Sequence, residues 1–299
     1  MKKENIGLLL GLVGVMCFSL TLPSTSVAVA YFGPTVTGLG RTVIVAIIVA
    51  IIFVVRREKL PTRKQLKSLI IVAVGAVLGF PLLTSWAMER LPVSHGAVVL
   101  ALLPLATAGI AIVRAGERPS RTFWLASFIG SGAVILYALS LGIGGFYLAD
   151  LALIAAVLIL GLSYAEGGNL SKEMGSWQVI AWAIVLGAPF FVVPVSLELS
   201  MAMLNAPMTA WISLLYLSVV SQFLAYVAWY GGMALGGIAR VSQLQYLQPF
   251  LMIVFASLFL GESVSPLTIA VAAIVVGAVF FGKNAPILQS ESVSVEAKQ

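Results

Sequence analysis

Most of the polar side chains that could bind a ligand lie in two predicted helices, 209–233 and 238–260. Within each helix they recur at helical spacing, which places them on one face. Neutral amides and phenols are tolerated in apolar surroundings where they face a cavity or bond a neighbouring helix. The candidate binding residues are Gln222, Tyr226, Trp229, Ser242, Gln245 and Tyr246, joined by Thr84, Trp86, Ser94, Tyr164 and Trp182 from other helices. A mostly apolar and aromatic lining of this kind suits an uncharged or zwitterionic organic molecule. Each residue could instead bond helix to helix or belong to an interfacial aromatic belt.

Arg41 is a charged residue within an apolar stretch, seven residues after Pro34. A guanidinium at the centre of a membrane helix costs at least about 2.5–3.5 kcal/mol, so we expect it to face other helices or water. It could contact an anion or carboxylate, or form a gating pair. Alternatively, it is a structural arginine that donates to loop carbonyls.

Glu166 follows an apolar run in the sequence LSYAEGGN. If the helix ends at Ala165, the carboxylate lies at the membrane boundary. If the helix continues to about Lys172, the carboxylate lies roughly two turns below the surface. In that position it could take up and release protons during transport.

Three further residues are candidates for gating or coupling. Pro104 and Pro249 interrupt apolar helices, and an internal proline is typical of a helix that bends. His95 opens a predicted span and could contact substrate, contribute to a gate, or cap the helix while partly hydrated. Glu117 and Glu262 end the two proline-containing helices, where we expect solvated boundary carboxylates with a structural role.

Composition identifies the elements that must hold these side chains. Of the 299 residues, 61% are hydrophobic and 9% charged, as in polytopic membrane proteins. A lone cysteine, Cys17, and a lone histidine, His95, exclude a cysteine-built metal site and disfavour a histidine-rich one. No Walker A loop, nucleophile cluster or basic stripe interleaved with aromatics occurs, so we expect no enzyme, no cofactor and no nucleic-acid partner.

Apolar runs of about twenty residues predict membrane-spanning helices. Orientation follows from the basic residues, because cytoplasmic loops are enriched in Lys and Arg. With a cytoplasmic N-terminus, fifteen basic residues fall in cytoplasmic segments and only Arg90 falls in an outer loop. Both termini are therefore predicted to be cytoplasmic, in a bacterial-type inner membrane. The ten predicted spans are 6–31, 34–55, 68–88, 94–113, 122–139, 146–165, 177–197, 209–233, 238–260 and 264–281.

The chain contains an internal repeat. Sliding the first half onto the second by 145 residues pairs Met88 with Met233, Pro104 with Pro249, Gly116 with Gly261, Glu117 with Glu262 and Gly132 with Gly277. Five spans per copy is an odd number, so the second copy must be inverted in the membrane. We predict an all-α fold of ten transmembrane helices as two inverted repeats, residues 1–143 and 144–283, followed by a disordered cytoplasmic tail, 284–299. Inverted repeats recur in secondary transporters, although channels can contain repeats as well.

These features resemble the ten-helix, EamA-type members of the drug/metabolite transporter superfamily. The resemblance rests on Gly-Leu-Gly-Arg41, on Pro104 with Gly116-Glu117, on their echo at Pro249 with Gly261-Glu262, and on Gly145 to Asp150. It implies an inner-membrane carrier, and many such carriers export amino acids and other metabolites. Small multidrug carriers of the superfamily use a first-span glutamate, which this chain lacks, so it is a poor candidate for exchanging cationic drugs for protons.

Two functions follow as hypotheses. The first is a secondary transporter that exports small organic metabolites, with aromatic or hydrophobic amino acids favoured, by alternating access. The second is a channel-like facilitator for small neutral or zwitterionic solutes on the same fold. Protons are a further candidate partner, and a monomer is favoured without excluding an oligomer.

Overall fold

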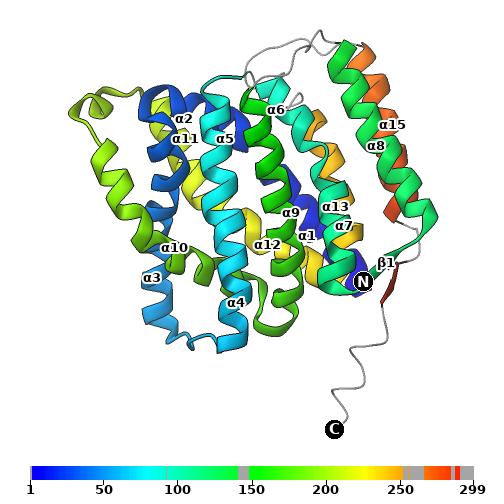
Figure 1. Ribbon diagram of the computed structural model, residues 1–299, viewed down its shortest axis with the longest axis horizontal. Helices are drawn as coiled ribbons and strands as arrows, with labels where there is room; N and C mark the ends of the chain where they lie inside the picture. Colours follow the sequence, from blue (N-terminus) through cyan, green and yellow to red (C-terminus); the bar gives the residue numbers. More distant parts are fainter. Residues whose placement is uncertain are drawn as a thin grey trace.

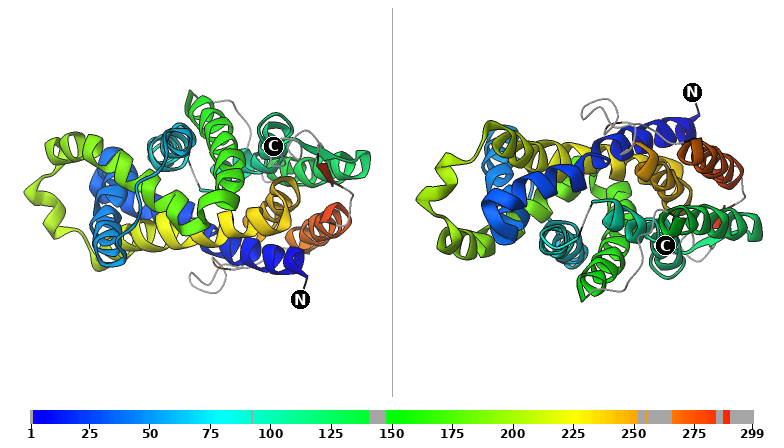
Figure 2. Two further views of the ribbon diagram at one scale, coloured as in Figure 1. Left: turned by 90° about the horizontal axis from the view of Figure 1, so that it is seen from below. Right: turned by 90° about the horizontal axis from the view of Figure 1, so that it is seen from above.

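The computed structural model describes residues 2–91, 93–140, 148–251, 255, 266–283 and 287–289. Helices make up nearly all of this part, and they stand side by side in an elongated bundle (Figures 1 and 2). Among the described residues, five stretches are long and apolar enough to cross a membrane: Lys3–Arg56, Arg63–Met88, Leu148–Met174, Ser176–Glu198 and Met208–Gly236. The helical membrane fold is therefore confirmed, while the count of ten crossings stays a prediction.

The first stretch folds back on itself at Gly33. Its 54 residues would extend about 80 Å as one helix, far more than the roughly 30 Å of the hydrocarbon core. Gly33 has a φ of 68°, a conformation that a residue with a Cβ rarely adopts, and Pro34 follows it. This break separates α1 and the start of α2 from α3, and the chain reverses direction there (Figure 1). The elements concerned are α1 (Lys3–Phe18), α2 (Thr21–Thr35), the π-helical η1 (Val36–Gly40) and α3 (Arg41–Arg56).

A capping box begins the second stretch. The Gln65 backbone N–H donates to the Thr62 hydroxyl at 3.3 Å, and the Thr62 backbone N–H donates to the Gln65 side chain at 2.9 Å. The stretch contains α4 (Arg63–Val72), the π-helical η2 (Ala73–Gly79) and α5 (Phe80–Met88). A third π-helical segment lies in the last long stretch, which consists of α11 (Met208–Leu215), η4 (Tyr216–Leu224) and α12 (Ala225–Gly236). Such wider turns occur often at functional sites.

The two proline-containing helices are both broken just before their proline. In the first copy, α6 (Val93–Leu100) ends before α7 (Leu103–Ala115) begins, and Pro104 lies in the first turn of α7. The second copy passes from α13 (Ile238–Ser242) into the 3₁₀ segment η5 (Gln243–Leu247) ahead of Pro249. Shifted by 145 residues, η5 falls on residues 98–102, so the breaks are equivalent. The predicted interruptions are therefore present in the structure.

The remaining elements complete the bundle. They are β1 (Glu117–Pro119), α8 (Arg121–Ser140), α9 (Leu148–Met174), α10 (Ser176–Glu198), the 3₁₀ segment η3 (Met201–Asn205), α15 (Pro266–Lys283) and β2 (Ile287–Gln289). Strand β2 pairs antiparallel with β1, with Arg118 opposite Leu288. The tail was predicted to be disordered from residue 284. Residues 287–289 instead form a strand because β1 offers them a backbone edge, and the rest of the tail lies outside the described residues.

Glycines join α1 to α12 across the two repeats. A Cβ on Gly7 would lie 2.4 Å from the Gly236 backbone nitrogen, and one on Gly232 would lie 2.7 Å from the Gly11 nitrogen. Each helix thus contributes two glycines four residues apart, which lets the backbones touch. Figure 2 shows the two helices side by side along the bundle.

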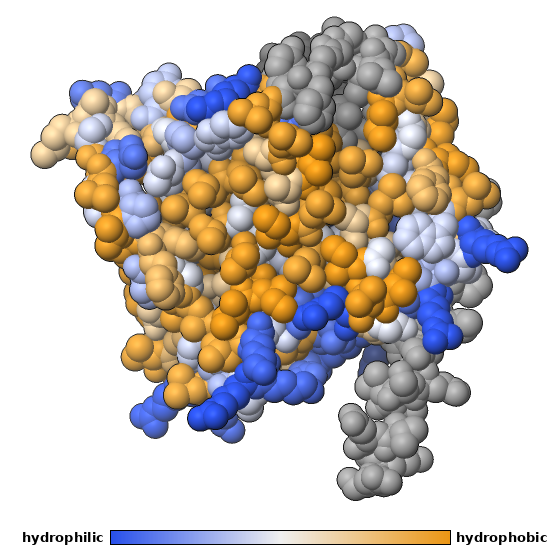
Figure 3. Space-filling model, viewed as in Figure 1, coloured by the Kyte–Doolittle hydropathy of each residue, from blue (hydrophilic) through white to orange (hydrophobic). Residues whose placement is uncertain are grey.

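The surface has the character of a membrane protein. A broad apolar belt crosses the middle of the molecule, and polar side chains gather at its upper and lower edges (Figure 3). Large apolar side chains are open at the surface, such as Ile47 at 63% and Phe190 at 78% exposed. An apolar surface of this extent marks contact with lipid rather than water. We call the lower edge in Figure 1 the basic end. There α1 begins at Lys3, α3 ends at Arg56 and α4 begins at Arg63.

Candidate functional site

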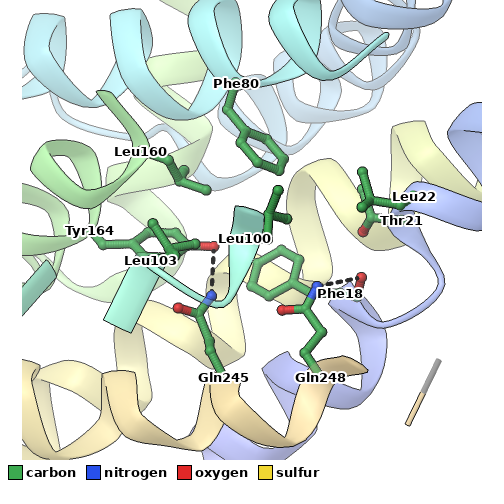
Figure 4. Close-up of a pocket in the computed structure, with 10 residues that line it drawn as sticks. All are labelled: Phe18, Thr21, Leu22, Phe80, Leu100, Leu103, Leu160, Tyr164, Gln245 and Gln248. Carbon is green, nitrogen blue, oxygen red and sulfur yellow. Dashed lines mark hydrogen bonds between the residues drawn. The ribbon is translucent and has the colours of Figure 1, made fainter. Parts of the chain in front are cut away.

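A small cavity lies inside the bundle where helices of both repeats meet. Its lining residues are Phe18, Thr21, Leu22, Phe80, Leu100, Leu103, Leu160, Tyr164, Gln245 and Gln248. They come from α1, α2, α5, α6, α7, α9, η5 and the residues just after η5, as Figure 4 shows. The space between them is about 10 Å³, which is room for one water molecule and not for an organic substrate. The site is therefore constricted in this conformation.

Two glutamines supply most of the polarity of the cavity. The Gln245 side-chain amide donates to the Tyr164 hydroxyl at 3.4 Å, and the Gln248 amide donates to the Phe18 carbonyl at 3.3 Å (Figure 4). Gln245 Oε1 has no hydrogen-bond partner although it is buried. A buried acceptor without a partner is costly, so this oxygen is available to a ligand donor.

Aromatic rings surround one side of the cavity. Phe18 meets Tyr226 edge-to-face with ring centroids 5.1 Å apart, and the ring centroids of Tyr164 and Trp229 are 5.4 Å apart. Tyr230 lies 5.5 Å from Tyr226, and its hydroxyl is 3.1 Å from the Ser163 hydroxyl. We call Phe18, Tyr164, Tyr226, Trp229 and Tyr230 the aromatic cluster. Trp229 has no partner for its indole N–H.

Arg41 begins α3 and is only 2% exposed. Its Nε and Nη1 atoms have no hydrogen-bond partner. The described residues place no carboxylate within ion-pair distance of it, and its electrostatic neighbour is the phenol of Tyr226. The structural alternative, in which Arg41 donates to loop carbonyls, finds no support at these two nitrogens.

Two side chains close to Arg41 in the fold, Gln222 in η4 and Thr42 in α3, bond to the π-helical segment η2. The Gln222 amide donates to the Ala76 carbonyl in η2 at 3.1 Å, and the Thr42 hydroxyl reaches the Val77 carbonyl at 3.5 Å. Pro81 follows Ala76 by five residues and Val77 by four, and it has no backbone N–H to donate to these carbonyls. Gln222 Oε1, like Gln245 Oε1, is buried without a partner.

Glu166 lies inside α9, which continues to Met174. The predicted continuation of the helix is therefore present, and Glu166 is only 9% exposed. Its carboxylate accepts from Arg114 Nε at 2.8 Å, lies 2.6 Å from Arg114 Nη2, and accepts from the Ser68 hydroxyl. These contacts tie α4, α7 and α9 together near the basic end. A role in proton coupling stays a prediction.

Glu117 differs from the expectation of a solvated boundary residue. It is 1% exposed, and its two carboxylate oxygens accept from the backbone N–H groups of Ile238 and Ala239, each at 2.8 Å. A carboxylate at this place satisfies orphan donors and complements the positive end of the helix dipole. The prediction failed because it considered only the helix that Glu117 ends, whereas the fold brings in the helix that it caps.

Several predicted binding residues lie away from the cavity or are already bonded. The hydroxyls of Thr84 and Ser242 bond to carbonyls of their own helices, of Phe80 at 2.6 Å and of Ala239 at 2.8 Å. Tyr246 donates to the Ser127 carbonyl at 3.0 Å and so joins η5 to α8. The indole of Trp86 stacks under Arg90, and that of Trp182 lies against Phe53 on α3. The side chains of Ser94 and His95 lie outside the described residues.

Other lining residues were not among the candidates. Gln248 could have been predicted from the sequence, because it follows Gln245 by three residues and so shares its helix face. Thr21, whose hydroxyl is 2.9 Å from that of Ser221, lies at the junction of α1 and α2. The apolar members carry no signal in the sequence, because leucines that line a cavity resemble those that face lipid.

Comparison with known proteins gives the family. The model of the EamA-like transporter family matches residues 5–139 and again residues 147–282. The chain belongs to the EamA-like transporter family. The resemblance stated from the sequence is confirmed, and the two matches agree with two repeats.

Two relatives and one solved structure extend this result. The chain is 41% identical over 274 residues to the protein of Bacillus subtilis (strain 168) named "Uncharacterized transporter YdeK", covering 91% of this chain and 94% of the relative. It is 20% identical over 255 residues to the "Probable terminal-alkyne amino-acid exporter" of Streptantibioticus cattleyicolor, covering 85% of this chain and 86% of that one. A crystal structure superposes with a TM-score of 0.76 at 17% identity, covering 93% of this chain and 98% of the other, which shows a shared fold.

Proposed function

We propose that this EamA-family transporter is a secondary carrier that exports small organic metabolites by alternating access, with aromatic or hydrophobic amino acids favoured. The observation that carries the proposal is the cavity, which is lined by both repeats at their broken helices and flanked by the aromatic cluster. Unpartnered amide oxygens near aromatic rings suit the ammonium and side chain of an amino acid. The named function of the Streptantibioticus relative agrees with this substrate class.

The basic residues orient the proposed carrier. If the chain crosses the membrane ten times, fifteen basic residues lie on one side. This excess supports our proposal that both termini and the basic end are in the cytoplasm of a bacterial-type cell. At that end, the Glu117 carboxylate accepts from the backbone of α13, and Glu166 forms an ion pair with Arg114. Arg240 lies 3.2 Å from the Glu4 carboxylate. We interpret these contacts as closing the cytoplasmic side. They would have to break for substrate to enter from the cell.

The constriction of the cavity favours a carrier over a channel-like facilitator. A space of about 10 Å³ cannot conduct an organic solute without rearrangement of the helices. A carrier that must rearrange on each cycle shows trans-stimulation, because loaded carriers return faster than empty ones.

Transport by the purified full chain in proteoliposomes tests the proposal. Vesicles are loaded with a labelled panel of all proteinogenic amino acids, and efflux is measured with and without unlabelled substrate outside. We expect saturable efflux of aromatic or hydrophobic members, accelerated by external substrate. Absence of saturable flux for every member would refute the proposed substrate class, and flux without trans-stimulation would favour the facilitator.

A further inference from the structure

Arg41 is a buried cation whose surroundings do not neutralise it. Its side chain is nine-tenths buried or more, and two of its three guanidinium nitrogens lack partners. Buried charges in proteins are paired or bound to a ligand, because an isolated one is strongly disfavoured. Of the buried carboxylates, Glu117 and Glu166 are bonded elsewhere, to α13 and to Arg114, and Asp150 has an interaction of its own. None of the ion pairs among the described residues includes Arg41.

Other unpartnered polar atoms lie on the elements around Arg41. Thr37 is one turn earlier in η1, Ser85 lies on α5 beside η1, and Gln222 lies on η4 beside α3. The hydroxyls of Thr37 and Ser85 and the Oε1 atom of Gln222 are all buried without a hydrogen bond. Unpartnered atoms on three elements that pack beside Arg41 need an explanation, since most buried polar groups in proteins are satisfied. They indicate a site that is completed by a ligand.

The chemistry of this set favours a carboxylate. A guanidinium fork donates two parallel hydrogen bonds to a carboxylate, and hydroxyl groups can donate to its remaining lone pairs. The free amide oxygen of Gln222 is an acceptor, which suits an ammonium group and not a second anion. The donor set and the acceptor together match the two ends of a zwitterion.

Tyr226 links Arg41 to the cavity. Its phenol is the electrostatic neighbour of Arg41, and its ring packs edge-to-face on Phe18, which lines the cavity. A ligand in an expanded cavity could reach Arg41 once these two rings separate. The apolar part of the ligand would then lie against the aromatic cluster.

We propose that Arg41 is the substrate-binding residue that recognises the carboxylate of the transported molecule, with Thr37 and Ser85 as additional donors. This assignment rests on the proposed function and narrows it, because the substrate must carry a free carboxylate. Amines and esters of the same side chain are then poor substrates.

Matched ligands test the assignment on the unmodified protein. The purified full chain in nanodiscs is titrated with L-phenylalanine, L-phenylalaninamide and 3-phenylpropanoate, with a panel of other aliphatic and aromatic carboxylates and their amides in parallel. We expect each bound acid to bind at least tenfold more tightly than its amide. Equal binding of acid and amide, or binding of amides alone, would overturn the assignment.

Variants separate ligand binding from a structural role. Arg41→Gln removes an unneutralised buried charge, so we expect a melting temperature without ligand that is unchanged or raised. The preference for acid over amide should disappear in Arg41→Gln and persist in part in Arg41→Lys. Arg90→Gln, at an exposed arginine, is the matched control and should keep the full preference. A lower melting temperature of Arg41→Gln with an intact acid preference would show a structural arginine.

The two proposals fail in different ways. If proteoliposomes transport amines or neutral metabolites but no carboxylate, the carrier function stands and the assignment of Arg41 is wrong. If no amino acid is transported, yet other carboxylates bind in an Arg41-dependent manner, the assignment stands and the substrate class must change. If neither the amino acids nor any carboxylate in the panel binds, both are rejected.

Discussion

The carboxylate of Glu117 accepts a hydrogen bond from the backbone N–H of Ile238 at 2.8 Å, although the two residues are 121 positions apart. Glu117 belongs to the first repeat, and Ile238 begins α13 in the second. The contact therefore joins the two repeats near the basic end, where the repeats must move relative to each other in an alternating-access cycle. A second bond, from the Ala239 N–H, makes the attachment bidentate.

Replacing Glu117 should loosen this attachment. Glu117→Ala leaves two buried N–H groups without acceptors, each costing about 1–3 kcal/mol, so we expect a clear loss of thermal stability in detergent. Glu117→Gln keeps one acceptor oxygen and should show a smaller loss. Glu198→Gln, at an exposed position at the end of α10, should change nothing. Equal stability of all three variants would show that the cap contributes no net stability.

The ion pair of Arg114 and Glu166 predicts a coupling that a double-mutant cycle can measure. Arg114 is partly exposed, with 38% of its side chain open, so we expect only about 1 kcal/mol between them. Glu166→Gln and Arg114→Met are compared singly and together by thermal unfolding. Additive effects would mean that the contact carries no interaction energy in solution.

Proton coupling through Glu166 makes a separate prediction. If the carboxylate exchanges a proton during transport, Glu166→Gln should abolish the dependence of flux on pH while keeping saturable transport. The measurement is efflux from proteoliposomes with the internal and external pH varied independently. A variant that keeps the pH dependence of the parent would assign Glu166 to the ion pair alone.

The glycine contact of α1 and α12 should tolerate no side chain. In Gly232→Leu the new Cβ would lie 2.7 Å from the backbone nitrogen of Gly11, so the helices must separate and the protein should fold poorly or melt early. Gly109→Ala is the matched control, because a Cβ there meets nothing within 4 Å and alanine favours a helix. Yield and melting temperature of the monodisperse protein measure both. A stable Gly232→Leu protein would contradict the packing described.

Gln245 and Ser242 should differ although they are three residues apart. Gln245→Leu removes an unpartnered oxygen from a side chain that lines the cavity, so we expect a KM for transport raised tenfold or more with little change in melting temperature. Ser242→Ala removes a hydroxyl that already bonds its own helix and should leave KM unchanged. The reverse ranking would place substrate binding at Ser242 rather than at Gln245.

The sequence by itself determined the class of the protein and its plan. Apolar runs of membrane length predict helices because lipid cannot satisfy a free backbone, and the helices are present. The 145-residue repeat predicted two copies, and the family model matches the chain twice. The positions of Pro104 and Pro249 predicted interruptions, and both helices break immediately before the proline.

Only the tertiary structure decided which face of each helix meets which partner. Lipid is as apolar as leucine, so hydropathy does not distinguish a side chain in the bundle from one in the bilayer. For this reason Tyr246, predicted at the cavity, instead bonds α8, and the neighbouring Gln245 lines the cavity. Partners far apart in sequence cannot be found from local spacing. Glu117 gained two backbone donors across the repeats, whereas two nitrogens of Arg41 have no acceptor.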